Sequence, residues 1–249
     1  ELFRSRNFSG SNLMTLSVYF ALYGTTFFLI IYAQNVMGFS ALQAGLVLAP
    51  LSLMMFFLSP RFGRLSGRLG SRLFMTIGPI VMGLGLLMFS RLQPDSSYWT
   101  GLLPAVIVYG LGLTSMVAPL TDTVISAVPV KHSGVAAAIN NAVSRGAALL
   151  AIGLLGVVVA TTFQGAVAEQ VTGLSLTPSH EQALGEAASD PTGRADPALL
   201  PDQAQRLIAE AYTQALQRAM LVSAVAAILG GLVAWATIRN PASASSPEP

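Results

Sequence analysis

The chain contains six long stretches with almost no charged side chains, and each is long enough to cross a lipid bilayer as a helix. The hydrocarbon layer is roughly 30 Å thick, so a helix of roughly 17 to 25 apolar residues spans it. Hydrophobic residues make up 53% of the 249 residues, charged residues make up 10%, and the mean hydropathy is +0.64. The sequence therefore predicts an all-α membrane protein, a bundle of six transmembrane helices. The candidate spans are 12–36, 42–60, 73–90, 99–127, 135–162 and 219–238.

Four parts are expected along the chain. Residues 1–162 form the first five transmembrane helices, and residues 163–218 form an extracytoplasmic loop. This loop ends in an amphipathic helix, because 202–218 lacks Gly and Pro and places its apolar residues along one side. Residues 219–238 form the sixth transmembrane helix, and 239–249, rich in Ser, Ala and Pro, form a disordered cytoplasmic tail. The chain opens at Glu1 without an initiator Met, so we expect it to be a fragment of a longer protein.

Positive charge gathers on one side of the predicted membrane topology. If the six spans alternate in direction, eight of the 13 Lys and Arg residues fall on the same side and most acidic residues fall on the other. By the positive-inside rule, both termini are cytoplasmic, and the protein is a multi-pass protein of the inner (plasma) membrane. The high pI then reflects topology, and we expect no nucleic-acid partner. The eight residues are Arg4, Arg6, Arg61, Arg64, Arg68, Arg72, Lys131 and Arg239.

Two segments resemble motifs of the major facilitator superfamily. Residues 62–72, FGRLSGRLGSR, resemble its cytoplasmic loop motif, G-x-x-x-D-R-x-G-R-[RK], although they lack the acidic residue. The matching residues are Gly63, Arg64, Gly67, Arg68 and Arg72. Residues 110–146 are similar to the fourth and fifth spans of the C-terminal half of the superfamily's 14-span drug:proton antiporters, through Gly110, Gly112, Pro119, Pro129, Gly134, Asn140, Arg145 and Gly146. The resemblance covers roughly residues 1–162.

This resemblance implies one half of a major facilitator fold, a bundle of 3+3 inverted repeats with the substrate site between two such bundles near the membrane midplane. The chain would be the C-terminal half of a proton-coupled multidrug efflux transporter that exports amphipathic or cationic small molecules. Its partners would be the N-terminal bundle of the same polypeptide, the drug-like substrate, protons and membrane lipid. The alternative is a stand-alone six-span protein that acts as a homodimeric channel or as a non-transporting scaffold.

Asp122 and Arg145 are the charged residues that fall within predicted spans. A charge near the bilayer centre costs roughly 2.5 to 3.5 kcal/mol on insertion scales, so such residues pair with one another or face a water-filled cavity. At 1.5 Å per residue, Asp122 lies roughly 9 Å and Arg145 roughly 16 Å from the cytoplasmic ends of their spans. We expect a gating or proton-coupling pair; the alternatives are a structural clamp and a hydrated Asp122.

Two further groups are candidates for the substrate cavity. Tyr19, Tyr23 and Phe27 recur every fourth residue on one face of the first span, near Gln34, and aromatic faces bind cations through cation–π contact. The alternative is packing against lipid or other helices. Asn140 and Asn141 form a polar stripe in the fifth span, for which a packing role of at least one Asn is the competing interpretation.

The residues of the loop motif, Arg61 to Arg72, have two candidate partners, namely the C-terminal ends of neighbouring helices and anionic lipid headgroups. The chain has no Cys, and its two histidines, His132 and His180, have no partners at metal-ligand spacing. No span contains a Ser–His, Asp–Asp or His–Glu arrangement. We therefore expect neither an enzyme nor a protein with a metal or a cofactor.

Overall fold

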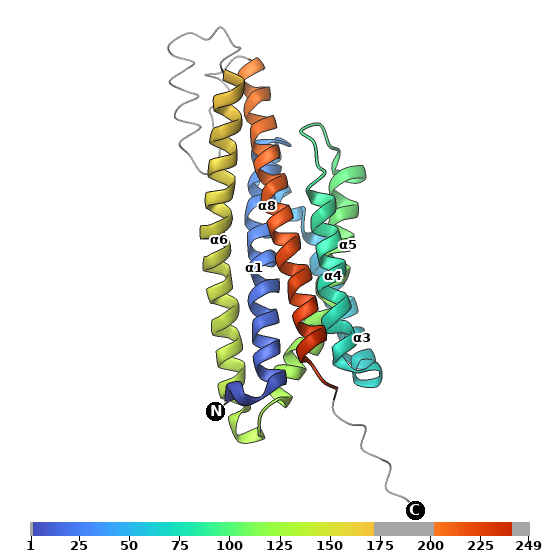
Figure 1. Ribbon diagram of the computed structural model, residues 1–249. Helices are drawn as coiled ribbons and strands as arrows, with labels where there is room; N and C mark the ends of the chain where they lie inside the picture. The colour runs from blue at the N-terminus through green and yellow to red at the C-terminus, as the bar shows by residue number, and fades with distance from the viewer. Residues whose placement is uncertain (1, 172–201, 241–249) are drawn as a thin grey trace, which may run out of the picture.

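The helices of this protein follow the apolar stretches of its sequence. The computed structural model describes residues 2–171 and 202–240 (Figure 1). Over these ranges the structure is helical and contains six helices, or helix pairs, that are long and apolar enough to cross a membrane. The elements are η1 (Leu2–Arg4), α1 (Arg6–Asn35), α2 (Ala41–Leu46), α3 (Ala49–Leu69), α4 (Ser71–Phe89), η2 (Tyr98–Leu102), α5 (Leu103–Ser126), η3 (Val130–His132), α6 (Ser133–Val171) and α8 (Asp202–Thr237).

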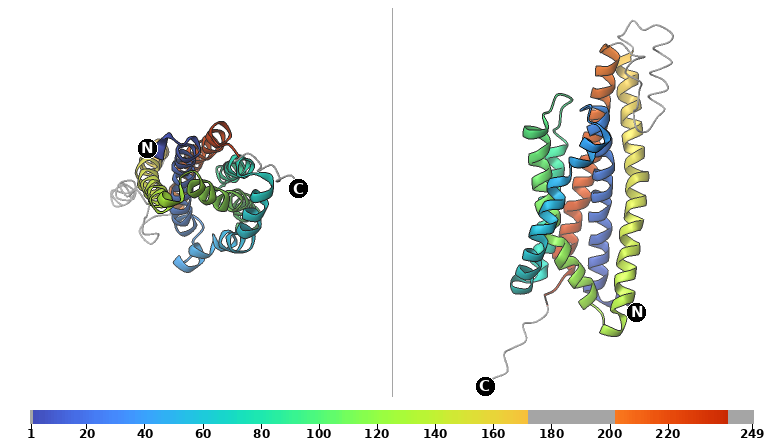
Figure 2. Two further views of the ribbon diagram at one scale, coloured as in Figure 1. Left: turned by 90° about the horizontal axis from the view of Figure 1, so that it is seen from below. Right: turned by 180° about the vertical axis from the view of Figure 1, so that it is seen from behind.

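Four helices, α1, α4, α5 and α8, form the centre of the bundle. α4 packs along α5 and α8, and α1 packs along α8 and α6. Seen along the bundle axis, α6 lies on one flank and α3 on the other, with α1 and α5 between them (Figure 2). α3 and α6 are the spanning helices with the smallest buried share. These two helices therefore keep most of their apolar surface uncovered by the described part of the chain.

The helices differ greatly in length. α6 has 39 residues and α8 has 36, whereas α4 has 19. At 1.5 Å per residue, α6 is about 58 Å long and α4 about 28 Å long, so α6 and α8 extend together past the end of α4 (Figure 1). Residues 202–218, expected to form an amphipathic helix, and residues 219–237 belong to this one continuous helix.

Small residues bring α4 and α5 into close contact. A Cβ atom added at Gly112 would lie 2.2 Å from the backbone nitrogen of Met82, and one added at Gly85 would lie 2.4 Å from the backbone nitrogen of Tyr109. Glycines at helix interfaces allow backbones to approach in this way, which favours packing in a membrane. The ring of Phe89 lies 5.9 Å from that of Tyr109, and both residues are fully buried.

The second span differs from the prediction at both ends. A capping box of Ser40 and Gln43 starts the short helix α2, and α3 begins separately with Pro50 in its first turn, where a missing N–H costs no hydrogen bond. The loop predicted after Pro60 is wrong for most of its length, because α3 continues through this proline to Leu69. Next to Pro60, the guanidinium of Arg61 donates to the Phe57 carbonyl at 3.1 Å.

The reversal between α3 and α4 takes place at Gly70 alone. Its φ of +89° lies in the left-handed region that favours glycine. A Cβ atom here would also lie 2.2 Å from the side chain of Asn240. The chain therefore turns sharply at Gly70, and α4 starts at Ser71 directly beside the C-terminal end of α8.

Candidate functional site

The three aromatic residues of α1 that were predicted to line the cavity are at least partly uncovered. Tyr23 and Phe27 are 38% and 40% exposed, whereas the neighbouring Phe28 is buried. The rings of Tyr19 and Tyr23 are 6.0 Å apart, and those of Phe27 and Phe28 are 5.0 Å apart at nearly right angles. Buried Phe28 thus supports Phe27 from the bundle interior. The result is an aromatic strip on α1, formed by Tyr19, Tyr23 and Phe27, that no described helix covers completely.

Asn140 joins α6 to α1 by hydrogen bonds. Its amide nitrogen donates to the Thr15 hydroxyl at 2.8 Å and to the side-chain oxygen of Asn12 at 3.2 Å. Asn12 and Thr15 are buried, and the Asn12 amide donates in turn to the Phe8 carbonyl at 2.9 Å. This arrangement matches the packing interpretation of one asparagine. Asn141, by contrast, is exposed.

Asp122 on α5 and Arg145 on α6 are both exposed. Within the described ranges, 2–171 and 202–240, no ion pair joins them to each other. The expected pair is therefore not formed in this conformation, because each side chain lies outside the packed interior of the bundle. A charge in a membrane span needs a partner or water, and neither residue has an ion-pair partner in the described part of the chain. Their roles in gating or coupling stay predictions.

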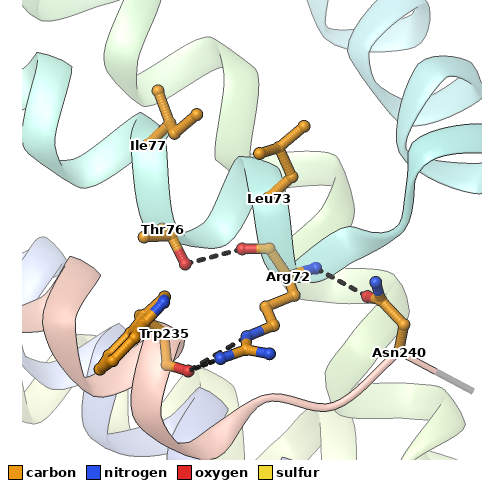
Figure 3. A pocket seen from close by; sticks show the side chains of 6 residues that line it. All are labelled: Arg72, Leu73, Thr76, Ile77, Trp235 and Asn240. Atoms are coloured by element: carbon orange, nitrogen blue, oxygen red, sulfur yellow. Dashed lines mark hydrogen bonds between the residues drawn. The ribbon is translucent and has the colours of Figure 1, made fainter.

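Arg72, the last residue of the loop motif, binds the C-terminal end of α8. Its Nε and Nη2 atoms donate to the Trp235 carbonyl at 3.1 and 2.7 Å, and its guanidinium carbon lies 5.8 Å from the centre of the Trp235 ring (Figure 3). Its backbone N–H donates to the side-chain oxygen of Asn240 at 3.1 Å. A cation at a helix C-terminus stabilises the exposed carbonyls of the last turn. One of the two predicted partners of the motif is thus present.

The start of α1 binds the same end of α8. The guanidinium of Arg6 donates to the Ala236 carbonyl at 2.8 Å. The side chain of Asn7 donates to the Arg239 carbonyl at 3.0 Å and accepts from the Arg239 N–H at 2.9 Å. The N-terminal and C-terminal helices are therefore tied together at one end of the bundle, hereafter the Arg72 end.

The other motif residues lie along the last turns of α3. Arg64 and Arg68 are exposed and, with Arg61 and Leu65, line an open pocket of about 400 Å³. A Cβ atom added at Gly63 would lie 3.3 Å from Ala118 on α5, so this glycine keeps α3 close to α5. Nothing lies within 4 Å of a Cβ atom added at Gly67.

At the opposite end of the bundle, α1 and α8 both hold the segment between α4 and η2. The Tyr32 hydroxyl donates to the Gln93 carbonyl at 2.8 Å, and the Gln217 amide donates to the Leu92 carbonyl at 2.6 Å. Gln34, a predicted cavity residue, is half-buried two residues after Tyr32. Sequence reasoning did not identify Asn12, Thr15 and Asn240 as contact residues; the signal available was a polar side chain inside or directly after an apolar span.

The sequence profile described as Major Facilitator Superfamily matches residues 1–172. Multidrug resistance protein Stp of Mycobacterium tuberculosis is 30% identical over 164 residues, which cover 64% of this chain and 29% of Stp. The tetracenomycin C resistance and export protein of Streptomyces glaucescens is 30% identical over 160 residues, 64% of this chain and 30% of that protein. The methylenomycin A resistance protein of Streptomyces coelicolor is 29% identical over 162 residues, 65% of this chain and 34% of that protein. The matched segment thus accounts for about a third of the length of these relatives.

Proposed function

Because this chain belongs to the Major Facilitator Superfamily, we propose that it forms one six-helix half of a drug efflux transporter. In this proposal it is the C-terminal half of a 14-span protein, and the N-terminal bundle of the same polypeptide completes the substrate path. The transporter exchanges protons for amphipathic or cationic drug-like molecules.

The observation that carries the proposal is the similarity to three proteins named for resistance to or export of drugs, each over about two thirds of this chain. Such transporters bind their substrate between two bundles. Six spans supply one bundle, and the matched segment covers 29% to 34% of those relatives. A second bundle is therefore part of the proposal.

The exposed features of α1, α5 and α6 fit this arrangement. The aromatic strip on α1 offers ring faces that stabilise a cationic or flat apolar molecule. Asp122 and Arg145 carry opposite charges and have no ion-pair partner among residues 2–171 and 202–240. A carboxylate beside a water-filled path binds and releases protons, so we assign proton coupling to Asp122 and gating to Arg145.

The substrate part of this proposal can be tested in the intact protein, produced in a bacterium that lacks its own drug exporters. Efflux of ethidium, a fluorescent aromatic cation, is measured for Tyr23→Ala and Phe27→Ala. A cation–π contact contributes about 0.5 to 2 kcal/mol, so we expect apparent affinity for ethidium to fall by about two-fold to thirty-fold.

The matched control is Met88→Ala on α4, which removes an exposed apolar side chain from another helix. This variant should transport ethidium as the unchanged protein does. Unchanged affinity for ethidium in both aromatic variants would show that the aromatic strip on α1 does not contact the substrate. Absence of efflux by the intact protein would contradict the proposed function.

A further inference from the structure

A pocket of about 220 Å³ lies between the first turns of α4 and the last turn of α8, at the Arg72 end of the bundle. Figure 3 shows the side chains around it, with the Arg72 guanidinium and the Asn240 amide on one side and the Trp235 ring on the other. The transport proposal assigns no role to this place, and the sequence names anionic lipid headgroups as a candidate partner of the loop motif without locating a site. Its lining residues are Arg72, Leu73, Thr76, Ile77, Trp235 and Asn240.

Two polar groups of this pocket keep donors that have no acceptor in the described part of the chain. Two nitrogens of Arg72, Nε and Nη2, bond to the Trp235 carbonyl, which leaves the Nη1 donors without a hydrogen bond in the described part of the chain. The Asn240 side-chain oxygen accepts the Arg72 N–H, so its amide nitrogen is also left with free donors there. Between residues 2–171 and 202–240, no carboxylate forms an ion pair with Arg72. The pocket therefore holds a positive charge without a carboxylate counter-ion among these residues, together with donors suited to an anion.

The apolar part of the pocket continues along both helices. Leu73, Ile77 and Leu84 are exposed on α4, at spacings that place them on one face. Val225, Leu229 and Leu232 are exposed on α8 in the same way, and they lead to Trp235, which is 59% exposed. Tryptophan beside an arginine at the end of a membrane span is typical of the level of the lipid headgroups. An occupant of this pocket thus has a charged end and an apolar end.

We propose that this pocket binds one anionic phospholipid, with the phosphate on the free donors of Arg72 and Asn240 and an acyl chain along the exposed apolar residues of α4 and α8. Guanidinium groups bind phosphate through short, charge-assisted hydrogen bonds. The same guanidinium bonds to the C-terminal end of α8, so the bound lipid compensates the charge that holds α8 to α4. Phosphate is shared by lipid headgroups and by free phosphate, whereas the apolar rows favour the lipid.

The experiment measures thermal unfolding of the intact protein in a neutral detergent while lipid is added. The probes are a short-chain phosphatidylglycerol, phosphatidylcholine with the same chains, and inorganic phosphate. The variants are Arg72→Gln, which removes the charge, and Ile77→Trp, which fills the apolar part of the pocket without removing any hydrogen-bonding group of Arg72. The matched control is Arg61→Gln, which removes an exposed arginine that does not line this pocket.

Phosphatidylglycerol should raise the melting temperature of the unchanged protein and of Arg61→Gln, with the same midpoint concentration. An arginine near an anionic lipid contributes about 1 kcal/mol, so Arg72→Gln should raise that midpoint about five-fold. Ile77→Trp should weaken the response as well, which keeps the test decisive if Arg72→Gln fails to fold.

Four results would overturn the proposal. A rise in melting temperature with phosphatidylcholine equal to that with phosphatidylglycerol would show that the anionic charge of the headgroup has no role. A response to inorganic phosphate equal to that for phosphatidylglycerol would make the pocket a free-phosphate site. An equal loss in Arg61→Gln, or an unchanged response in Ile77→Trp, would show that the lipid acts on general surface charge and not in this pocket.

Discussion

At the scale of single residues, some polar side chains of this bundle join helices and others face outward. Asn140 donates to Thr15 and Asn12, and so links α6 to α1 across buried surface. Its neighbour Asn141 is exposed. Asp122 and Arg145 are exposed as well, which fits contact with water, substrate or a second bundle better than a role in holding this bundle together.

The two adjacent asparagines give a matched pair for a stability test. Hydrogen bonds between membrane helices contribute about 0.6 to 2 kcal/mol. Asn140→Ala should therefore lower the thermal stability of the protein in detergent by an amount in this range, because Thr15 and Asn12 lose their donor. Asn141→Ala should change it little. Equal effects of the two substitutions would contradict the assignment of Asn140 as the linking residue.

The sequence identified the polar positions of the spans but not their partners. Asn140 and Asn141 are adjacent and chemically identical, and both were predicted to line the cavity. They differ only because helical geometry turns one toward α1 and the other away, and the rotation of α6 about its axis depends on packing that a sequence of Ala, Gly, Val and Leu leaves open. The same uncertainty affected Asp122 and Arg145, whose depth followed from residue counting but whose direction did not.

At the scale of helices, close packing of α4 against α5 depends on glycine. Gly78 and Gly112 face each other, since a Cβ atom added at Gly112 would lie 2.6 Å from the Gly78 carbonyl oxygen as well as against Met82. These neighbours are backbone atoms, so a side-chain rotation cannot make room. The interface therefore holds the two helices at a fixed, short separation.

Alanine at Gly112 tests this interface, and alanine at Gly153 is its control. Alanine favours a helix over glycine by about 1 kcal/mol at both sites, but at Gly112 it also forces α4 and α5 apart, at a cost of about 1 to 3 kcal/mol. We expect Gly112→Ala to lower the melting temperature and the yield of folded protein. Gly153 has nothing within 4 Å of its added Cβ atom, so Gly153→Ala should be neutral or stabilising. A stable Gly112→Ala protein would contradict the packing account.

Helix positions were largely predictable because the thickness of the membrane sets the length of an apolar span. Helix ends were less predictable. The Arg- and Gly-rich stretch after Pro60 is typical of a loop by composition, yet it continues α3 to Leu69. Local composition carries no information on the distant residues that stabilise such a continuation, such as Asn240, which contacts the turn at Gly70 from the other end of the chain.

At the scale of the whole molecule, both described ends of the chain lie at the Arg72 end of the bundle, where Asn7 bonds to Arg239 (Figure 1). Eight of the 13 Lys and Arg residues lie at the same end: they stand before and at the start of α1, in the last turns of α3, at the start of α4, in η3 and after α8. An even number of spans returns the chain to the side on which it began. We propose on these grounds that the Arg72 end is cytoplasmic.

Single-cysteine labelling tests this orientation, because the native sequence has no Cys. Gly67 is exposed at the Arg72 end, and Thr100 is exposed near the start of η2 at the opposite end. The two variants are Gly67→Cys and Thr100→Cys. A membrane-impermeant thiol reagent added to intact cells should label Thr100→Cys and leave Gly67→Cys unlabelled until the cells are opened. The reverse pattern would place the termini outside the cytoplasm.

The central claim is that this chain supplies one half of a proton-coupled drug exporter, and transport by purified protein in liposomes tests it most directly. An imposed pH gradient should drive ethidium movement by the intact protein, and a protonophore should abolish it. Asp122→Asn should remove the dependence on the gradient, whereas the control Asp95→Asn, an exposed acid between α4 and η2, should retain it. Residues 1–249 alone should not transport. Gradient-driven transport by residues 1–249 alone would contradict the account. Transport by the intact protein at a rate that does not depend on the pH gradient would contradict it as well.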